Sequence, residues 1–234
     1  MKRMPQDALA IVPARGGSKR IPRKNIRPFL GRPILARVVE TLLASGCFAE
    51  VMVSTEDDEI AAVARSAGAA VPFRRSRENA NDTATTAAVL LEVLAAYERS
   101  FASFCCVYPT AVFVTPEVVE RGYELLQASG ADTVIPVLRF SFPIQRAFRV
   151  QQGELKMFQP EHMSTRSQDL EPAYHDAGQF YWARTARFLE QKTLYARKAV
   201  PLVLDEMQAH DIDSEEDWRI AEFKYAYRDE RKTA

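Results

Sequence analysis

The chain has 234 residues, with 31 Lys plus Arg and 31 Asp plus Glu, so its formal net charge is zero. A chain of this length can bury one sizeable core, and a single domain spanning residues 1–234 is therefore expected. The balanced charge argues against a nucleic-acid-binding protein, which would more often carry a basic excess. No stretch of the sequence approaches the ~20 consecutive apolar residues of a membrane span.

The amino-terminal segment and the cysteines both indicate a cytoplasmic protein. Residues 1–7 lead into an apolar run that is too short and too soon broken for a signal peptide. Cys105 and Cys106 are adjacent in a strand-like run, so their side chains should point to opposite faces of a sheet. Together with Cys47 they are expected to be core residues of a reduced protein rather than a disulfide or a metal site.

Strand-like and helix-like segments alternate through the first half of the chain. Pro33 suits the first turn of a helix, and Gly46 and Gly68 follow the last turns of two predicted helices. The alternation predicts an α/β fold, a mostly parallel Rossmann-like sheet with helices on both faces. The predicted strands are 8–13, 51–55, 71–73, 104–108 and 133–138, and the predicted helices are 33–45, 57–67, 85–99 and 116–128.

This rhythm breaks at about residue 139, and residues 139–177 form an excursion rich in aromatic residues, Pro, Gln and charge. The pattern of residues 149–158 predicts a protruding β-hairpin that turns at Gln152-Gly153. The aromatic content argues against a disordered loop, and a long excursion from a compact α/β core usually serves a site or an interface. Core segments resume at 178–182 and 199–204, and an amphipathic helix is predicted over 214–227.

The loop after the first predicted strand combines glycine with dense positive charge. Open α/β sheets place their ligands at the carboxyl ends of such buried strands. Two glycines allow backbone N–H groups to approach a ligand closely. Like charges at this density repel one another, so the loop either binds a polyanion, such as a nucleoside triphosphate, or stands solvated at the surface. Its five cations are Arg15, Lys19, Arg20, Arg23 and Lys24.

The loop matches neither of the common phosphate-binding motifs. It lacks G-x-x-x-x-G-K-[ST] and G-x-G-x-x-G, which argues against a P-loop ATPase and a nicotinamide-dependent dehydrogenase. The loop contains two strings, Ala14-Arg15-Gly16-Gly17-Ser18-Lys19 and Pro22-Arg23-Lys24-Asn25. Together they resemble the signature loop of a family of cytidylyltransferases, the CMP-sialic acid and CMP-Kdo synthetases, which activate acidic nine-carbon and eight-carbon sugars.

This resemblance implies a nucleotidyltransferase-type fold, a nucleotide site at the loop, and a homodimer in which the excursion reaches the partner subunit. Arg15, Lys19 and Lys24 are expected to hold the triphosphate and to act in catalysis, whereas Arg20 and Arg23 can equally be solvated. The residues of this loop expected at the nucleotide are Ala14, Arg15, Gly16, Gly17, Ser18, Lys19, Lys24 and Asn25.

A second cluster is the segment His210-Asp211-Ile212-Asp213. On an extended segment, residues two apart face the same side, at most ~7 Å apart at Cα. Two carboxylates held in this way can share one Mg²⁺, although Asp213 is equally suited to cap the following helix together with Glu216. The resembled synthetases carry an Asp-x-Asp metal motif here, which implies Asp211 and Asp213 as ligands of Mg²⁺, with Mn²⁺ as a possible substitute.

Two further segments match parts of the family that lie near the nucleotide. In the first, the spacing to an Asp-Thr-rich turn at Asp82 and Thr83 favours Arg75 over Arg74 as the nucleotide contact. Residues 82–86 are also suited to capping the next helix.

The second segment is Tyr108-Pro109-Thr110, at the end of the central predicted strand. The resemblance places Thr110 at the nucleotide and Tyr108 at the sugar. Family members often continue with a small residue and a second Pro, whereas this chain has Ala111-Val112, which leaves the shape of the loop open.

Residues 158–182 mix Arg, Gln, His and Asp with aromatic residues, a combination that suits a polar acidic sugar. Arg166 can pair with a sugar carboxylate, and Gln168 and Gln179 can recognise hydroxyl or acetamido groups. His175 is either a catalytic base or a residue that holds the loop in place. These strings resemble the pseudaminic acid branch of the family more than the sialic acid branch. The residues expected at the sugar are Tyr108, Arg166, Gln168, His175, Asp176, Gln179 and Tyr181.

The predicted activity is therefore that of a cytidylyltransferase that joins CTP to an acidic nine-carbon sugar, pseudaminic acid or a relative, and releases pyrophosphate. The alternatives are a CMP-sialic acid or CMP-Kdo synthetase of the same fold, and a catalytically silent nucleotide-binding protein. The silent protein would bind CTP without releasing pyrophosphate.

Overall fold

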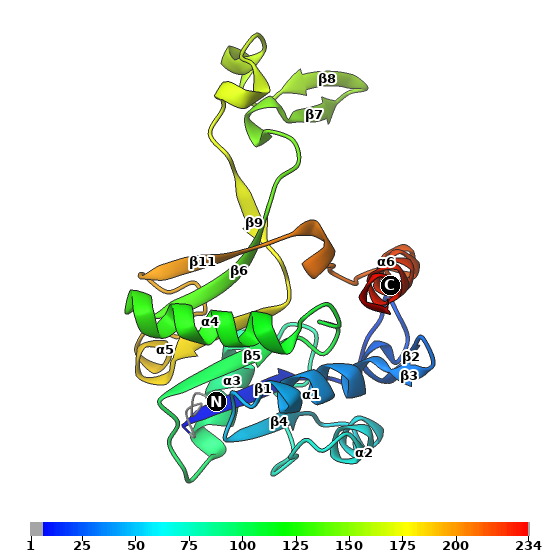
Figure 1. Ribbon diagram of the computed structural model, residues 1–234, viewed down its shortest axis with the longest axis vertical. Coiled ribbons are helices and arrows are strands. Elements are labelled where there is room, and N and C mark those ends of the chain that lie inside the picture. The colour runs from blue at the N-terminus through cyan, green and yellow to red at the C-terminus, as the bar shows by residue number, and fades with distance from the viewer. Residues whose placement is uncertain (1–6, 234) are drawn as a thin grey trace.

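A seven-stranded sheet with parallel and antiparallel neighbours forms the centre of the protein (Figure 1). This computed structural model describes residues 7–233, and the side chains of residues 7–229. Residues 1–6, on which the expected absence of a signal peptide partly rests, lie outside the described residues. The strand order is β11 (Ala199–Leu204), β6 (Thr133–Arg139), β10 (Phe180–Arg184), β5 (Ser103–Val107), β1 (Ala8–Pro13) and β4 (Glu50–Ser54), and β9 (Tyr174–Asp176) also pairs with β6.

The sheet is mixed, which corrects the expectation of a mostly parallel one. Strand β1 runs parallel to β4 and β5, and β11 runs parallel to β6. Strands β9 and β10 run antiparallel to β6, and β10 is also antiparallel to β5. The reason is topological. The chain leaves the sheet at the end of β6 and returns beside it, so the returning strands must run the opposite way.

The helices begin close to the residues that the sequence predicts, because side-chain caps define their starts. The Asp57 carboxylate accepts from the Ile60 N–H, and the hydroxyls of Thr85 and Thr115 accept from Ala88 and Val118 in the same way. The helices are α1 (Ile34–Ser45), α2 (Asp58–Ser66), α3 (Thr86–Ala96), α4 (Pro116–Ser129), α5 (Thr185–Gln191) and α6 (Glu215–Thr233).

Both faces of the sheet are covered by helices, as predicted. The side chains of β1 alternate: Ala10 and Val12 belong to a core shared with α1, α2, α4 and α6, whereas Leu9 and Ile11 belong to a core shared with α3 and α5. The three cysteines are fully buried in these two cores and carry no disulfide, which confirms their assignment as core residues. Within the described residues, no helix is long and apolar enough to cross a membrane.

The predicted strand at 71–73 is wrong. Residues 71–73 form no strand, and the only pairing beside them among the described residues is the parallel bridge between the preceding Ala70 and Met52. Pro72 has no N–H to donate to a ladder, which disfavours a continued strand at this position.

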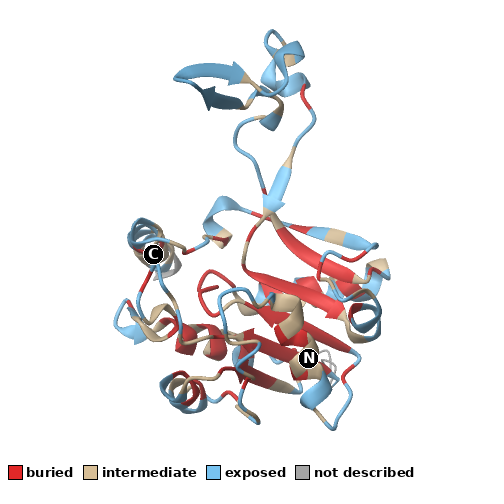
Figure 2. Ribbon diagram, turned by 180° about the vertical axis from the view of Figure 1, so that it is seen from behind, coloured by how far each residue is buried: buried red, intermediate tan, exposed pale blue. Residues whose placement is uncertain are grey.

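The excursion between β6 and β9 projects away from the sheet (Figure 1) and is largely exposed (Figure 2). It carries the predicted hairpin, β7 (Phe148–Gln151) and β8 (Glu154–Met157). The turn residues Gln152 and Gly153 both have positive φ, 53° and 83°, as a type I′ hairpin turn requires. Short elements complete the fold: β2 (Pro28–Phe29) and β3 (Arg32–Pro33), and the 3₁₀ turns η1 (Lys24–Ile26), η2 (Ile144–Arg146), η3 (Pro160–His162), η4 (Ser167–Asp169) and η5 (Glu206–Gln208).

Candidate active site

The basic loop leaves the carboxyl end of β1 and is fixed by hydrogen bonds of its own backbone. The Gly16 N–H donates to Glu56 Oε1 at 2.7 Å, and Asn25 Nδ2 donates to the carbonyl of Arg15 at 2.8 Å. A Cβ on Gly16 would lie 2.6 Å from a carboxylate oxygen of Asp57, so a side chain at this position would collide with the α2 N-terminus. Gly16 therefore allows close packing. A Cβ on Gly17, by contrast, would meet no atom within 4 Å, so there is open space beside the loop at this position.

Arg23 anchors the loop to the start of α2. Its guanidinium donates to both carboxylate oxygens of Asp57, at 2.5 and 3.0 Å, and to Glu59 at 2.7 Å. The hydrogen bond from Arg23 holds the pKa of Asp57 below its ordinary value. Arg23 itself adopts a left-handed conformation, φ 55°, which this bidentate pairing helps to stabilise. Of the two arginines left open by the sequence, Arg23 is thus a structural residue and not simply solvated.

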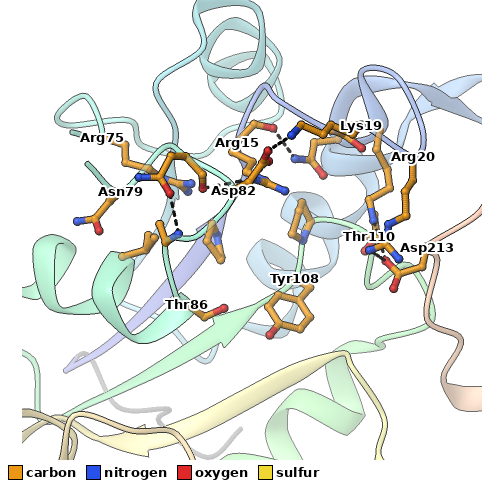
Figure 3. A pocket seen from close by; sticks show the side chains of 18 of the residues that line it. Arg15, Lys19, Arg20, Arg75, Asn79, Asp82, Thr86, Tyr108, Thr110 and Asp213 are labelled. Carbon is orange, nitrogen blue, oxygen red and sulfur yellow. Dashed lines mark hydrogen bonds and ion pairs between the residues drawn. The ribbon is translucent and has the colours of Figure 1, made fainter. Parts of the chain in front are cut away.

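The loop forms one wall of a cleft of about 730 Å³ at the carboxyl ends of β1 and β5 (Figure 3). The cleft contains most of the residues expected at the nucleotide and both of those expected at the metal. From the predicted set it is lined by Arg15, Ser18, Lys19, Lys24, Asn25, Arg75, Asp82, Tyr108, Thr110, Asp211 and Asp213.

Two cations of the loop converge on one carboxylate. Arg15 Nη1 lies 2.6 Å from Asp82 Oδ1, and Lys19 pairs with the other oxygen of the same group. The hydrogen bond from Lys19, and to a smaller extent that from Arg15, holds the pKa of Asp82 below its ordinary value. Arg15 and Lys19 thus already point at one position of negative charge, the arrangement that a phosphate group requires.

The other side of the cleft brings cations to Asp213. Arg20 Nη2 lies 2.8 Å from Asp213 Oδ1, and Lys24 Nζ lies 3.4 Å from the same oxygen. Lys24 also donates to the carbonyl of Ile212 at 2.7 Å. Arg20, which the sequence left open as a solvated residue, therefore lines the cleft (Figure 3).

Asp213 does not cap α6. The Ser214 hydroxyl accepts from the Asp217 N–H, and Asp217 Oδ2 accepts from the N–H groups of Ser214 and Asp213. Ser214 and Asp217 form this cap, so the alternative in which Asp213 caps the helix together with Glu216 is wrong. A serine one residue closer to the helix takes the role, and the Asp213 carboxylate instead faces the cleft, where it pairs with Arg20 and Lys24.

Asp211 opens onto the same cleft as Asp213. Partial desolvation by the surrounding protein raises the pKa of Asp211, and the nearby Asp213 carboxylate raises it further. Such mutual repulsion is relieved by a cation, and two carboxylates are a donor set that suits Mg²⁺, which keeps several waters and uses substrate phosphates as further ligands. Within residues 7–233, no three His, Cys, Asp or Glu side chains lie close enough together to hold a metal ion by protein ligands alone.

The structure places Arg75, and not Arg74, on the cleft. Arg75 is buried and its guanidinium donates to the hydroxyl and the carbonyl of Ser54. Arg74 is exposed and faces the other way, onto Glu56 and Asp58.

Thr83, which the sequence places near the nucleotide, does not line the cleft. Its N–H and hydroxyl both donate to Asn81 Oδ1 in a local turn, and the turn presents Asn81 and Asp82 instead. The helix cap that the sequence allowed at 82–86 is made by Thr85. Ala14, Gly16 and Gly17 also lie outside the cleft lining.

Several cleft residues were missed or given no role from the sequence. Asn79 is held by Glu92, whose carboxylate also accepts from the N–H and hydroxyl of Ser76. The pattern Ser76-x-x-Asn79 ahead of a helix was the available signal. The added lining residues are Pro13, Arg20, Asn79, Asn81, Ala84, Thr86, Val89 and Pro109.

The residues expected at the sugar are not gathered in this cleft, apart from Tyr108. Arg166 and Gln168 are exposed on the excursion, and Figure 1 shows that segment pointing away from the loop. His175 contacts the ring of Phe140, with centroids 4.8 Å apart, near the base of the excursion. The sugar set is thus divided between the sheet and the excursion of one chain.

Two members of the sugar set, Tyr181 and Gln179, are buried in this structure. Tyr181 is 3% exposed and its hydroxyl donates to Asp176 at 2.7 Å, while Tyr195 donates to the same carboxylate at 2.5 Å. Burial is the main cause of the raised pKa of Tyr181, and the bond to Asp176 raises the pKa of Tyr195 to about 12. Gln179 is 1% exposed and bonds to backbone carbonyls. Asp176 is thereby occupied by two tyrosines rather than free for a sugar.

An α/β sheet with a basic glycine-containing loop at the end of its first strand, facing a carboxylate pair across a cleft, defines a nucleotidyltransferase-type fold. The solved CMP:2-keto-3-deoxy-manno-octonic acid synthetase complexed with CTP superposes with a TM-score of 0.68 at 17% identity, over 94% of this chain and 99% of that one. A 4-diphosphocytidyl-2C-methyl-D-erythritol synthase from Anaerococcus prevotii gives 0.64 at 12% identity, over 94% and 98%. At these identities the likeness establishes the fold.

The chain belongs to the cytidylyltransferase family, whose model matches residues 9–227. It is 38% identical over 221 residues to a pseudaminic acid cytidylyltransferase of Campylobacter jejuni, covering 93% of this chain and 95% of the relative. It is 33% identical to a CMP-N,N'-diacetyllegionaminic acid synthase of Legionella pneumophila, covering 92% and 94%. These relatives span almost the whole chain, the excursion included.

The pairing of Arg23 with Asp57 predicts a pH-dependent contribution to stability. In Asp57→Asn the amide still caps α2, but the ion pair is lost, so the variant should be less stable at pH 7 by roughly 1 kcal/mol or less, since Arg23 is partly exposed. The folded-state pKa of Asp57 lies below its ordinary 3.8. The stabilisation is therefore present above that value and is lost as pH falls through the lower folded-state pKa.

Urea unfolding of wild type and Asp57→Asn across this pH range measures the effect, and the two free energies should converge in acid. Asp58→Asn, at an exposed neighbouring carboxylate, is the control and should change little. A gap between wild type and Asp57→Asn that stays constant with pH would contradict the prediction.

Proposed function

We propose that this protein transfers CMP from CTP to an acidic nine-carbon sugar, pseudaminic acid, with release of pyrophosphate. The observation that carries the proposal is the convergence of Arg15 and Lys19 on one anionic position, opposite Asp211 and Asp213, in a chain of the cytidylyltransferase family. The choice of sugar rests on the relatives: 38% identity to pseudaminic acid cytidylyltransferase against 33% to the legionaminic acid enzyme.

The reaction is an in-line displacement at the α-phosphorus of CTP. The anomeric hydroxyl of the sugar forms the new P–O bond, its proton is released, and the bond to the departing pyrophosphate breaks. Arg15, Lys19 and Lys24 hold the triphosphate and offset the charge on its oxygens. Asp211 and Asp213 are the proposed ligands of Mg²⁺, with Mn²⁺ as a substitute. A bound Mg²⁺ would supply charge neutralisation on the phosphates and a lower pKa for a hydroxyl bound to it.

The nucleotide is proposed to lie along the cleft, between the basic loop and the turn that carries Arg75, Asn81 and Asp82, with Thr110 at its end. Tyr108 borders the place where the sugar would meet the α-phosphate. Residues 1–234 form one domain in this proposal, with the excursion at 139–177 serving dimerisation and the sugar. The buried, unbonded cysteines agree with a reaction in the cytoplasm.

The excursion is proposed to dock on a second copy of the chain, because its hairpin has an apolar face with no partner on its own subunit. Val150 and Leu155 are register partners on one face of the hairpin and are 74% and 69% exposed. Phe148 lies two residues from Val150, on the same face, and is also exposed. Across such a dimer, Arg166 and Gln168 of one excursion would complete the sugar site of the other subunit.

A pyrophosphate-release assay tests the function directly. CTP is offered with pseudaminic, legionaminic, sialic and Kdo acids in turn, and pseudaminic acid is expected to give the highest kcat/KM. Preference for another sugar would reassign the substrate within the family. Binding of CTP with no pyrophosphate released from any sugar would instead support the silent nucleotide-binding protein.

Removal of a cation from the loop should weaken CTP use. Arg15→Ala or Lys19→Ala is expected to lower kcat/KM for CTP at least about tenfold, since charge-assisted hydrogen bonds are worth roughly 1.5–3 kcal/mol each. The unfolding temperature should hardly move, because changes at exposed loops usually lie within about ±0.5 kcal/mol. Arg74→Ala, at the arginine that faces away from the cleft, is the matched control. Near-normal kcat/KM in both loop variants would refute the phosphate role.

Asp213→Asn separates a metal ligand from a structural carboxylate. The helix cap belongs to Ser214 and Asp217, so the stability of the variant should hold. Loss of a ligand that supports several kcal/mol of charge stabilisation should lower turnover by roughly a hundredfold, with partial rescue at high Mg²⁺ or Mn²⁺. Asp211→Asn should lose turnover similarly. Full activity of Asp213→Asn at ordinary Mg²⁺, or activity that persists in EDTA, would exclude the two-carboxylate site.

The dimer is tested at the hairpin. Wild type should sediment as a dimer at micromolar concentration, and the double variant Val150→Asp/Leu155→Asp should sediment as a folded monomer with impaired sugar use. Phe223→Asp, at a similarly exposed apolar residue on α6, should remain a dimer. A monomer with full activity would contradict the shared sugar site.

A further inference from the structure

Gln179 is a buried polar residue for which contact with the sugar gives no explanation. It lies at the turn between β9 and β10 and is 1% exposed. Its Oε1 is buried and has no hydrogen-bond partner among the described residues. Burying an acceptor without a hydrogen bond costs free energy. The hydrogen bonds of the amide nitrogen in the same group must therefore hold the side chain in place.

The side-chain amide nitrogen of Gln179 faces three backbone carbonyls. It lies 3.2 Å from the oxygen of Ala177, 3.2 Å from that of Gly178 and 3.2 Å from that of His210. The first two bonds are local to the turn. The third joins the sheet to a segment 31 residues later in the sequence, immediately before Asp211.

This long-range bond is one of several that hold the backbone of the segment carrying the two carboxylates. The carbonyl of His210 is held by Gln179, the carbonyl of Ile212 accepts from Lys24 at 2.7 Å, and the Asp213 N–H donates to Asp217. Asp211 thus stands between two anchored carbonyl groups, one on either side of it along the chain.

The turn that carries Gln179 also lies beside Asp211. Gly178 has a positive φ of 62°, and a Cβ built on it would lie 3.4 Å from Asp211 Cγ, at ordinary van der Waals distance. The turn and the carboxylate are therefore neighbours, and the hydrogen bond from Gln179 reaches the segment from this side.

The two carbonyl anchors differ in how they respond to substrate. Lys24 is a cation on the cleft wall, placed to exchange its protein partners for phosphate oxygens. Gln179 is neutral and buried, so neither nucleotide nor salt competes for it. Its hold on His210 persists while the cations of the loop change partners.

We propose that Gln179 is a positioning residue, which through the His210 carbonyl fixes Asp211 in the geometry that binds the catalytic metal. The proposal rests on the proposed function, because it takes Asp211 as a metal ligand. Mg²⁺ demands near-ideal octahedral geometry at short distances, so a small displacement of one carboxylate is enough to weaken it. Residues that orient metal ligands commonly change metal affinity 10–100-fold when replaced.

Gln179→Asn and Gln179→Met test the proposal at two levels. Asn keeps an amide for the nearby carbonyls of Ala177 and Gly178 but is one methylene too short for His210, whereas Met removes the donors altogether. Gln191→Met is the matched control, because Gln191 also bridges two segments by its amide, accepting from Arg197 and donating to Asp132 at 3.0 Å, away from the cleft.

The readout is Mn²⁺ affinity in the presence of saturating CTP without sugar, measured by the loss of free-Mn²⁺ electron paramagnetic resonance signal, with unfolding temperature recorded for each variant. Gln179→Asn should bind Mn²⁺ at least about tenfold more weakly than wild type. Its kcat at ordinary Mg²⁺ should fall, while KM for CTP should change less than about threefold, since the cations that hold the triphosphate are intact. Gln191→Met should lose stability without losing Mn²⁺ affinity.

The outcomes distinguish this inference from the proposed function. If Asp211→Asn weakens Mn²⁺ binding but a folded Gln179→Asn does not, the positioning role is wrong and the metal site stands. If Gln191→Met weakens Mn²⁺ binding as much as Gln179→Asn does, the effect is one of general stability and the positioning role is again overturned. If Asp211→Asn leaves Mn²⁺ binding unchanged, both the metal site and the role of Gln179 fail. Should Gln179→Met not fold, the Gln179→Asn comparison still decides.

Discussion

Mutual repulsion within the basic loop is the constraint on which the rest of the site depends. Five cations within ten residues repel one another, and other parts of the chain place negative charge beside them. Asp57 and Glu59 at the start of α2, Asp82 ahead of α3 and Asp213 ahead of α6 supply it. The loop is therefore held by three segments far apart in the sequence, and the cleft exists because those segments meet around it.

The ion pairs of the loop differ in how far they are buried. This difference separates the pair that stabilises the fold from the pairs that a ligand can replace. The pairing of Arg23 with Asp57 is bidentate, part-buried and combined with a helix cap, so it belongs to the fold. The pairs of Lys19 and Arg20 are largely exposed, and such pairs contribute little to stability. A triphosphate and its cation can thus replace them at low cost.

The path of the chain after β6 determines how the sugar residues are distributed. The excursion carries Arg166 and Gln168 outward, and β9 and β10 bring the chain back antiparallel into the centre of the sheet. The return places Gln179 and Tyr181 in the interior, where they bond to neighbouring groups of the protein. The cleft proposed for the nucleotide is therefore formed within one chain, whereas the residues proposed for the sugar are divided, and the proposed dimer would bring them together.

The sequence by itself determined the strands and helices with strong periodicity, the hairpin turn at Gln152-Gly153 and the basic loop, because caps, alternation and charge density are local. Its resemblance to the cytidylyltransferases also pointed to Arg75 and the two aspartates, which the fold brings to the cleft. Tertiary structure decided the rest. The antiparallel insertion of β10 depends on strand pairing across long separations, and the cap of α6 depended on competition between Ser214 and Asp213 for one helix end. Burial decided the surroundings of Gln179. In the sequence its polar side chain looks like a ligand contact, whereas in the fold it is buried and bonds to the carbonyl of His210, because folding brings together two turns 31 residues apart.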